Sequence, residues 1–152
     1  MSIKYFQRRQ DKLSDELSKH DLDGMLVTNM VHIRYLCGFT GSSATLLVTQ
    51  EGTTFVSDGR YVFQSENEVK GAEILIDSIS HFEVIKNKNL LKNGQKIAID
   101  GNNVSYQNFV TIGKVLTHIE LVNMTNIIET MAMQKDEKEL EAIKTAVEIT
   151  DM

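Results

Sequence analysis

The sequence predicts a single α/β domain in which helices cover both faces of a mixed β-sheet. Short apolar runs typical of strands alternate with amphipathic stretches typical of helices. Two of these runs, Ala44–Thr49 and Thr53–Val56, are joined by a turn at Glu51-Gly52, a pattern that predicts an antiparallel hairpin. The run Met25–Thr28 is continuously apolar, as expected for a strand whose two faces are both covered.

The first third of the chain predicts two helices around that buried strand. Ile3, Phe6, Leu13 and Leu17 share one face of a helix over residues 4–19, and Gln10 is the one polar residue in this stripe. A loop at 20–24 leads into the strand, and a short helix follows over residues 30–37. Gly38 can end this helix in a left-handed conformation.

The middle of the chain predicts further alternation after the hairpin. Asp58 is a suitable N-cap for the first of these helices, and Ser105 for the last. In the last helix Phe109, Ile112, Val115 and Leu116 are expected to face inward. The predicted elements are a helix from about Arg60 to Val69, a strand Glu73–Asp77, a helix His81–Leu91, a turn at Asn93-Gly94, a strand Lys96–Asp100, a helix from 105 to about 117, and a strand Ile119–Val122.

The last 27 residues differ from the rest. A short helix is predicted over Asn126–Met133, and Asp136 with Glu139 has the pattern of a capping box at the start of another. An apolar stripe of Leu140, Ile143 and Val147 then runs toward Met152 without a helix-ending residue. We expect this apolar face to need a partner, either on this domain or in residues beyond it.

Composition excludes several classes of function. The 152 residues suffice for one domain, and 41% hydrophobic with 24% charged residues is typical of a soluble globular protein. A net charge of −5 argues against non-specific nucleic-acid binding, which needs a basic face. No apolar run is long enough to span a bilayer, and the first residues lack the apolar core of a signal peptide. We therefore expect a cytoplasmic protein with no nucleic-acid or membrane partner.

Residues that commonly carry chemistry do not form a recognisable catalytic or metal motif. The four histidines His20, His32, His81 and His118 are widely separated, so the spacing predicts no metal site. Cys37, the one cysteine, is expected to be buried and structural. Because five helical residues place His32 about 140° away from it, that histidine is not expected to activate the thiol. We predict no catalytic residue in this chain.

The hairpin should return two clusters, Gly38–Ser42 and Ser57–Tyr61, to one edge of the sheet. In the structural interpretation, Asp58 is a helix cap, Arg60 is its ion partner and Phe39 is part of the core. In the functional interpretation an arginine binds the carboxylate of a peptide ending in proline, and an aromatic wall contacts its ring. The residue types favour function for Arg34 and Phe39, with Asp58 and Tyr61 mainly structural.

These clusters also carry a family resemblance. The segment Ile33–Ser42 (IRYLCGFTGS), followed by Asp58–Tyr61 (DGRY), resembles the N-terminal domain of Xaa-Pro peptidases, the prolidase, aminopeptidase P and creatinase enzymes. The resemblance implies a ribonuclease-H-like fold for residues 1–125. It further implies that residues 126–152 are linker helices leading to a C-terminal metallopeptidase domain that this sequence lacks.

The resemblance also implies a role. In such enzymes a "pita-bread" domain holds two metal ions, usually manganese, through two aspartates, one histidine and two glutamates, which would lie beyond Met152. The N-terminal domain drives dimerisation or tetramerisation, and its loop reaches the partner subunit's active site. The matching candidates for contact with a proline-containing peptide are Arg34, Phe39, Thr40, Ser42 and Arg60. The alternative is a peptide- or protein-binding module from a non-catalytic relative.

Overall fold

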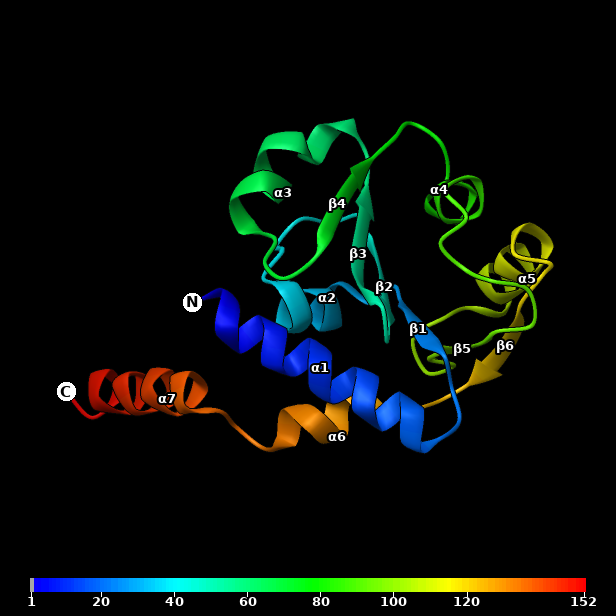
Figure 1. The fold of residues 1–152 in the computed structure, drawn as a ribbon. Coiled ribbons are helices and arrows are strands. Elements are labelled where there is room, and N and C mark those ends of the chain that lie inside the picture. The colour runs from blue at the N-terminus through cyan, green and yellow to red at the C-terminus, as the bar shows by residue number, and fades with distance from the viewer. Residues whose placement is uncertain (1) are drawn as a thin grey trace.

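The computed structural model describes residues 2–152 and contains a six-stranded mixed sheet with the order β4-β3-β2-β1-β5-β6 (Figure 1). Strand β1 lies inside the sheet, antiparallel to β2 and parallel to β5. The hairpin β2–β3 is antiparallel, whereas β3–β4 and β5–β6 are parallel pairs. The strands are β1 Gly24–Val27, β2 Thr45–Thr49, β3 Gly52–Ser57, β4 Glu73–Ile76, β5 Lys96–Ile99 and β6 Glu120–Asn123.

Helices cover both faces of this sheet, as the sequence predicts. Helices α1, α2 and α6 pack on one face, and α4 and α5 pack on the other (Figure 1). The helices are α1 Ile3–Lys19, α2 Met30–Cys37, α3 Val62–Glu68, α4 His81–Asn87, α5 Tyr106–Val115, α6 Ile127–Met133 and α7 Glu137–Thr150, with a 3₁₀ turn at Gly59–Tyr61.

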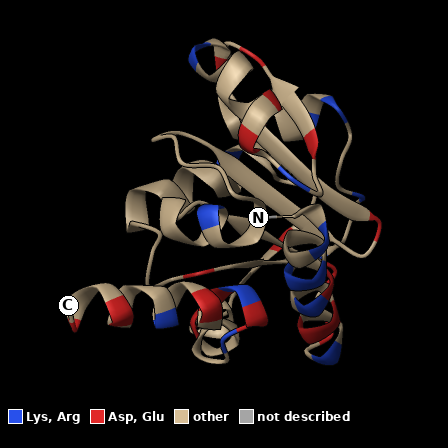
Figure 2. Ribbon diagram, turned by 90° about the vertical axis from the view of Figure 1, so that its left-hand side faces the viewer, with Lys and Arg blue, Asp and Glu red and all other residues tan. Residues whose placement is uncertain are grey.

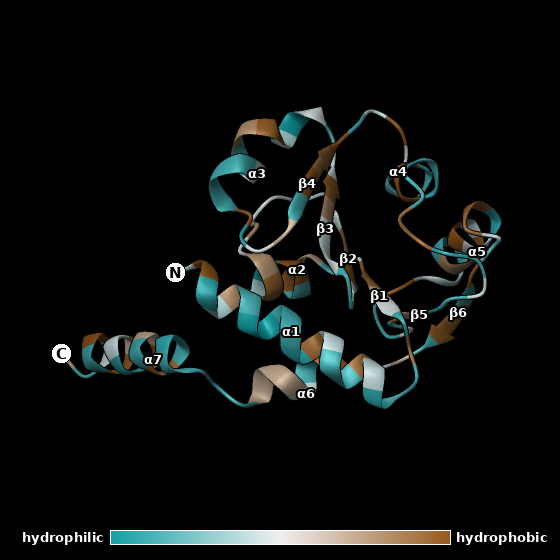
Figure 3. Cartoon of the chain, viewed as in Figure 1, coloured by the Kyte–Doolittle hydropathy of each residue, from teal (hydrophilic) through white to brown (hydrophobic). Residues whose placement is uncertain are grey.

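The strands divide their side chains between two hydrophobic cores. In β1, Met25 and Val27 point into the core under α1, α2 and α6, whereas Leu26 points into the core under α4 and α5. All four β1 residues are buried, which explains the unbroken apolar run in the sequence. Figure 3 shows the same concentration of hydrophobic residues along the strands.

Three details correct the sequence-based expectations. Helix α4 ends at Asn87, four residues early, and Asn89 then adopts a left-handed φ of 51° that a continuing helix would exclude. Phe109 is 41% exposed because α5 packs on the sheet chiefly through Ile112 and Leu116. Ile3, at the start of α1, is also exposed, whereas the rest of its apolar stripe is buried.

The packed part of the chain extends further than residue 125. Helix α6 buries Ile127, Ile128 and Met131 in the core beside α1, so it packs with the rest of the fold. Helix α7 has no buried residue and extends away from the core (Figure 1). Its capping box at Asp136 and Glu139 is formed as expected. The change from core to exposed arm therefore lies near residue 134.

The surface of α7 carries both charged and apolar residues. Acidic and basic side chains alternate along it (Figure 2), and Leu140, Ile143 and Val147 are about half exposed. Among residues 2–152, none of the helices combines the length and the apolar character needed to cross a membrane.

Candidate functional site: a groove between α1, α2 and α3

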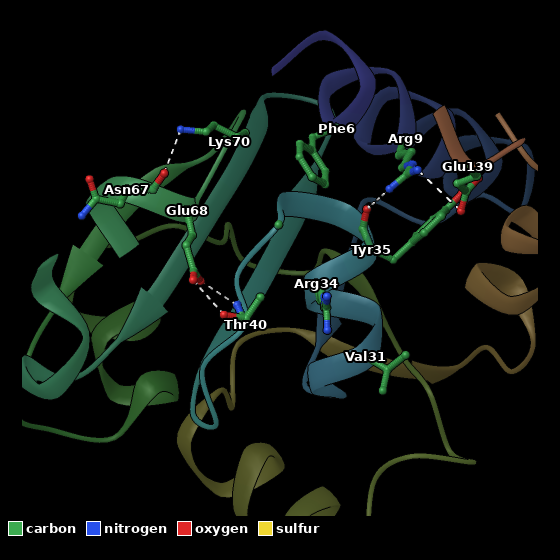
Figure 4. A pocket seen from close by; sticks show the side chains of 11 residues that line it. Phe6, Arg9, Val31, Arg34, Tyr35, Thr40, Asn67, Glu68, Lys70 and Glu139 are labelled. Carbon is green, nitrogen blue, oxygen red and sulfur yellow. Dashed lines mark hydrogen bonds and ion pairs between the residues drawn. The ribbon is translucent and has the colours of Figure 1, made fainter. Parts of the chain in front are cut away.

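A broad concave surface lies where α1, α2, α3 and the start of α7 approach one another. It is an open groove of about 550 Å³. Figure 4 shows its side chains, which are contributed by the ends of four helices and by the loop after α2. They are Phe6, Arg9, Val31, Arg34, Tyr35, Gly38, Thr40, Asn67, Glu68, Lys70 and Glu139. The groove therefore includes two of the residues that the sequence selects, Arg34 and Thr40.

Gly38 shapes the floor of the groove. It ends α2 with a left-handed φ of 89°, as expected, and its amide donates a hydrogen bond to the carbonyl of Arg34. A Cβ atom at this position would lie 3.0 Å from the carbonyl oxygen of Glu68 and 3.0 Å from the Phe6 ring. Both the conformation and the close approach of α1 and α3 therefore require glycine here.

At one end of the groove Arg34 is exposed, and its side chain extends from α2 beside Thr40 (Figure 4). None of the carboxylates in residues 2–152 forms an ion pair with it. Thr40 is held instead by Glu68, which accepts hydrogen bonds from the Thr40 amide at 2.8 Å and hydroxyl at 2.7 Å. An arginine without a carboxylate partner retains its full capacity to bind an anion.

The carboxylate of Glu68 is held in its charged form. Burial by itself raises the pKa of this group, but hydrogen bonds from Thr40 and Gln64 and the positive charge of Arg34 outweigh burial and lower the pKa below its ordinary value. The loop after α2 is thus attached to α3 by a charged acceptor at neutral pH.

At the other end of the groove Arg9 is buried and donates three hydrogen bonds. Its Nη1 donates to the carbonyl oxygen of Tyr35 at 2.7 Å, and its Nη2 lies 2.6 Å from Oδ2 of Asp136. The guanidinium stacks 4.2 Å from the centroid of the Tyr35 ring. The role of Arg9 is not visible in the sequence, because nothing local distinguishes Arg9 from the neighbouring Arg8.

Gln10 has a comparable structural role. Its Nε2 donates to the carbonyl oxygens of Leu36 and Lys70, both at 2.9 Å, so it joins α1 to the ends of α2 and α3. The sequence carries a signal for this role, since Gln10 is the polar exception in an otherwise apolar stripe. A buried polar residue in such a place is expected to satisfy backbone groups.

The remaining candidates lie on the loops beside the groove. The hydroxyl oxygens of Ser42 and Tyr61 are 2.5 Å apart, so the two loop clusters meet at one edge as expected. Arg60 donates to both carboxylate oxygens of Asp58 at 2.9 Å, and these bonds lower the pKa of Asp58 to about 2. Asp58 also caps the 3₁₀ turn. The geometry therefore matches the structural interpretation, in which Asp58 is a cap and Arg60 is its ion partner.

Phe39 corrects the functional interpretation. Its ring is fully buried and makes edge-to-face contacts with Phe55 at 4.7 Å and with Tyr61 at 5.3 Å. A ring enclosed in this way cannot form a wall for a ligand. Phe39 instead fixes the loop that carries Thr40, and the close contact of Gly41 with the same ring fixes it further.

Cys37 is structural, as expected. It is fully buried, and burial raises the pKa of its thiol to about 11, so the thiolate needed for nucleophilic attack is scarce at neutral pH. Among the described residues, the groove therefore combines the exposed guanidinium of Arg34, and the ammonium of Lys70, with apolar and hydrogen-bonding walls, and Cys37 gives it no activated nucleophile.

Comparison with known proteins places this geometry in a family. Residues 9–134 match the family model described as "Creatinase/Prolidase N-terminal domain". The chain is also 26% identical to the uncharacterized peptidase YqhT of Bacillus subtilis over 141 residues, which cover 93% of this chain and 40% of that protein. The chain thus spans less than half the length of this curated relative.

Solved structures agree. The N-terminal domain of the cytoplasmic peptidase PepQ from Mycobacterium tuberculosis superposes with a TM-score of 0.73 at 25% identity, covering 82% of this chain and 98% of that one. The X-Pro aminopeptidase of Thermotoga maritima superposes with a TM-score of 0.78 at 26% identity, covering 93% of this chain and 40% of that one. Together with the family match, these likenesses show that the chain belongs to the creatinase/prolidase N-terminal domain family, found in Xaa-Pro peptidases.

Proposed function

We propose that this chain is the non-catalytic N-terminal domain of a metal-dependent Xaa-Pro dipeptidase or aminopeptidase. In this role it mediates self-association and presents the edge of its groove to the active site of the partner subunit. A cytoplasmic location is part of the proposal, supported by the likeness to the N-terminal domain of a cytoplasmic peptidase.

The observation that carries the proposal is that the side chain of Arg34 is exposed and has no carboxylate partner within residues 2–152. Its guanidinium is exposed at the mouth of the groove and has no ion pair within residues 2–152, while Thr40 beside it is held in place by Glu68. A short peptide ending in proline offers a carboxylate that suits this guanidinium. Ser42 lies on the same loop edge, but Arg60 is already paired with Asp58 and adds less.

The two metal ions of the peptidase reaction would be held by the C-terminal domain, not by this chain. The expected ligand set is two aspartates, one histidine and two glutamates. Within residues 2–152, the one group of three or more possible ligands brings together a single histidine, aspartate and glutamate, which does not fit a dinuclear site of that kind. The role of this domain is therefore to position and restrict the substrate.

The exposed arm supports a contact with further protein. Leu140, Ile143 and Val147 of α7 are 46%, 47% and 52% exposed, and such a stripe on one helix is typical of an interface. The C-terminal domain of the same polypeptide and a second copy of this domain are the two occupants that the proposal requires.

Two measurements on the purified 152-residue chain test the proposal. The chain, with or without Mn²⁺, is expected to release no amino acid from Xaa-Pro dipeptides. In a fluorescence-anisotropy titration with a labelled Xaa-Pro dipeptide, Arg34→Ala should weaken binding at least about tenfold, because one charge-assisted contact contributes about 1.5–3 kcal/mol. Arg8→Ala, a matched change outside the groove, should bind like the wild type.

The outcomes separate the alternatives. Metal-dependent hydrolysis by the chain alone would contradict the non-catalytic role. If the gene downstream of residue 152 lacks the five metal ligands but Arg34→Ala still weakens peptide binding, the chain is a peptide-binding module from a non-catalytic relative. Equal binding by Arg34→Ala and the wild type would reject the groove as the recognition site.

A further inference from the structure

Three residues far apart in the sequence meet at the end of β5, outside the groove. His32 lies in the first turn of α2, Asp100 follows β5, and Glu129 lies on α6. One possible ligand atom from each lies within 4.8 Å of the other two. The sequence spacing predicts no metal site, since no two of these residues are closer than 29 positions; the fold alone brings them together.

Two of these groups are buried, Glu129 is partly exposed, and two of the polar atoms in the cluster lack a hydrogen-bond partner. His32 is 9% exposed and Asp100 is 5% exposed. The Nδ1 atom of His32 and the Oε2 atom of Glu129 are both buried without a hydrogen-bond partner. Such atoms are uncommon in folded proteins and indicate a missing partner, because an unsatisfied buried polar group costs about 1–3 kcal/mol.

The negative charge of the cluster also favours binding of a cation. Asp100 and Glu129 place two carboxylates in one cluster, and within residues 2–152 neither forms an ion pair with a lysine or arginine. The one opposing group is His32, whose Nε2 lies 3.4 Å from Oε1 of Glu129. Two carboxylates held in one cluster repel one another unless a positive charge lies between them.

Asp100 is held in position for this role. Its Oδ1 accepts from the Asn102 amide at 3.0 Å, and its Oδ2 accepts from Nδ2 of Asn103 at 2.6 Å. Asn103 in turn accepts a hydrogen bond from Asn29, the N-cap of the helix that carries His32. Hydrogen bonds that orient a ligating carboxylate and link it to a second ligand's helix are typical of the surroundings of metal ligands.

We propose that His32, Asp100 and Glu129 bind a single divalent transition-metal ion, of which Zn²⁺ is the best match. One imidazole nitrogen with two carboxylate oxygens suits zinc better than Mg²⁺ or Ca²⁺, which take oxygen ligands. Ligands about 2 Å from zinc lie roughly 3.3 Å apart, so the cluster must contract. The Glu129 side chain, 41% exposed, is free to make that movement.

The ion would fasten α6 to the sheet. His32 anchors α2, Asp100 the end of β5, and Glu129 the helix from which the exposed arm α7 departs. A metal at this point would fix where the arm leaves the domain. With three protein ligands, at least one coordination position remains for water.

The test uses the 152-residue chain after treatment with EDTA. In calorimetric titration with ZnCl₂ we expect one equivalent to bind, and the melting temperature should rise by several degrees and return to its starting value on renewed EDTA. His32→Gln and Glu129→Gln should each weaken binding at least about tenfold. His20→Gln and Glu148→Gln, at exposed positions, are the matched controls and should bind like the wild type.

Clear results would overturn the proposal. Absence of binding at millimolar Zn²⁺ would reject the site. The site would also be rejected if His32→Gln and Glu129→Gln both still bound one equivalent of Zn²⁺ with the affinity of the wild type. If His32→Gln does not fold, Glu129→Gln decides the question, because its partly exposed side chain is replaced by one of equal size. Co²⁺ provides a second readout: a visible absorption band in the wild type should be lost in Glu129→Gln.

Discussion

The two ends of the groove contain the same residue type in opposite states. At one end Arg9 is 7% exposed and is held by Tyr35 and Asp136. At the other end Arg34 is exposed and, within residues 2–152, has no ion pair. Both project from helices that form the walls of a single cavity (Figure 4).

The difference teaches which arginine is structural and which is available for binding. A buried guanidinium that already donates from Nε, Nη1 and Nη2 has little left to offer a ligand, and its loss leaves the carboxylate of its partner without a compensating charge. An exposed guanidinium without a partner contributes little to folding and can accept a carboxylate. Substitutions at the two ends should therefore affect different properties.

The largest effect is expected for Arg9→Ala. This change removes the hydrogen bond to Tyr35 and leaves the carboxylate of Asp136 without its ion partner beside the start of α7. We expect the free energy of unfolding to fall by about 2–3 kcal/mol, measured by urea denaturation.

Arg34→Ala is the matched control for this change. Because Arg34 lacks an ion pair, its replacement should alter the free energy of unfolding by less than about 0.5 kcal/mol. If Arg9→Ala and Arg34→Ala lower the free energy of unfolding equally, Arg34 is as structural as Arg9 and the distinction between the two ends of the groove is wrong.

Gly41→Ala, in the loop that follows α2 at the Arg34 end of the groove, is also expected to lower the free energy of unfolding. A Cβ atom at this position would collide with the ring of Phe39 and lie 2.8 Å from the ring of Tyr61. Overpacking of this kind costs about 1–3 kcal/mol, measurable by thermal or urea unfolding. Gly113→Ala is the control: a Cβ atom there meets nothing within 4 Å, and removing a helical glycine should stabilise α5 by about 0.5–1 kcal/mol.

The smallest effect concerns acid stability at the Arg9 end. Partial burial raises the pKa of Asp136, but hydrogen bonds from the Glu139 amide and from Arg9 outweigh it, so the pKa lies below the ordinary 3.8. The folded state therefore binds fewer protons than the unfolded state. The resulting stability is present above pH 4 and is lost as the pH falls through the lowered value.

Asp136→Asn should flatten this dependence. Comparing unfolding free energies at pH 6 and pH 3 in the wild type and the variant isolates the contribution of Asp136, since the other carboxylates titrate in both proteins. If the free energy of unfolding changes equally between pH 6 and pH 3 in the wild type and in Asp136→Asn, the charge of Asp136 does not contribute to stability through its ion pair with Arg9.

Much of the fold could be predicted because its signals are local. The hairpin, the buried strand β1 and the capping box at Asp136 each depend on residues within a few positions of one another. The edge where Ser42 meets Tyr61 was also predictable, because antiparallel strands return their flanking loops to the same end of the sheet. Element boundaries shifted where a single conformation, such as the positive φ of Asn89, ended a helix early.

The site itself was only partly predictable. Arg34 was selected for the chemistry of its side chain and Thr40 through the family resemblance, but Phe39, selected for its aromatic ring, is buried. Arg9 could not be identified, since its partner Asp136 lies 127 residues away. The same holds for the cluster of His32, Asp100 and Glu129.

The sequence by itself thus determined the fold class, the family and the loop that forms the edge of the groove, because periodicity, caps and turns act over short stretches of chain. Tertiary structure alone decided which arginine is buried, which aromatic ring belongs to the core, and which titratable groups meet. Those properties depend on contacts between residues far apart in the chain, and a pattern along the sequence does not encode the distance between them.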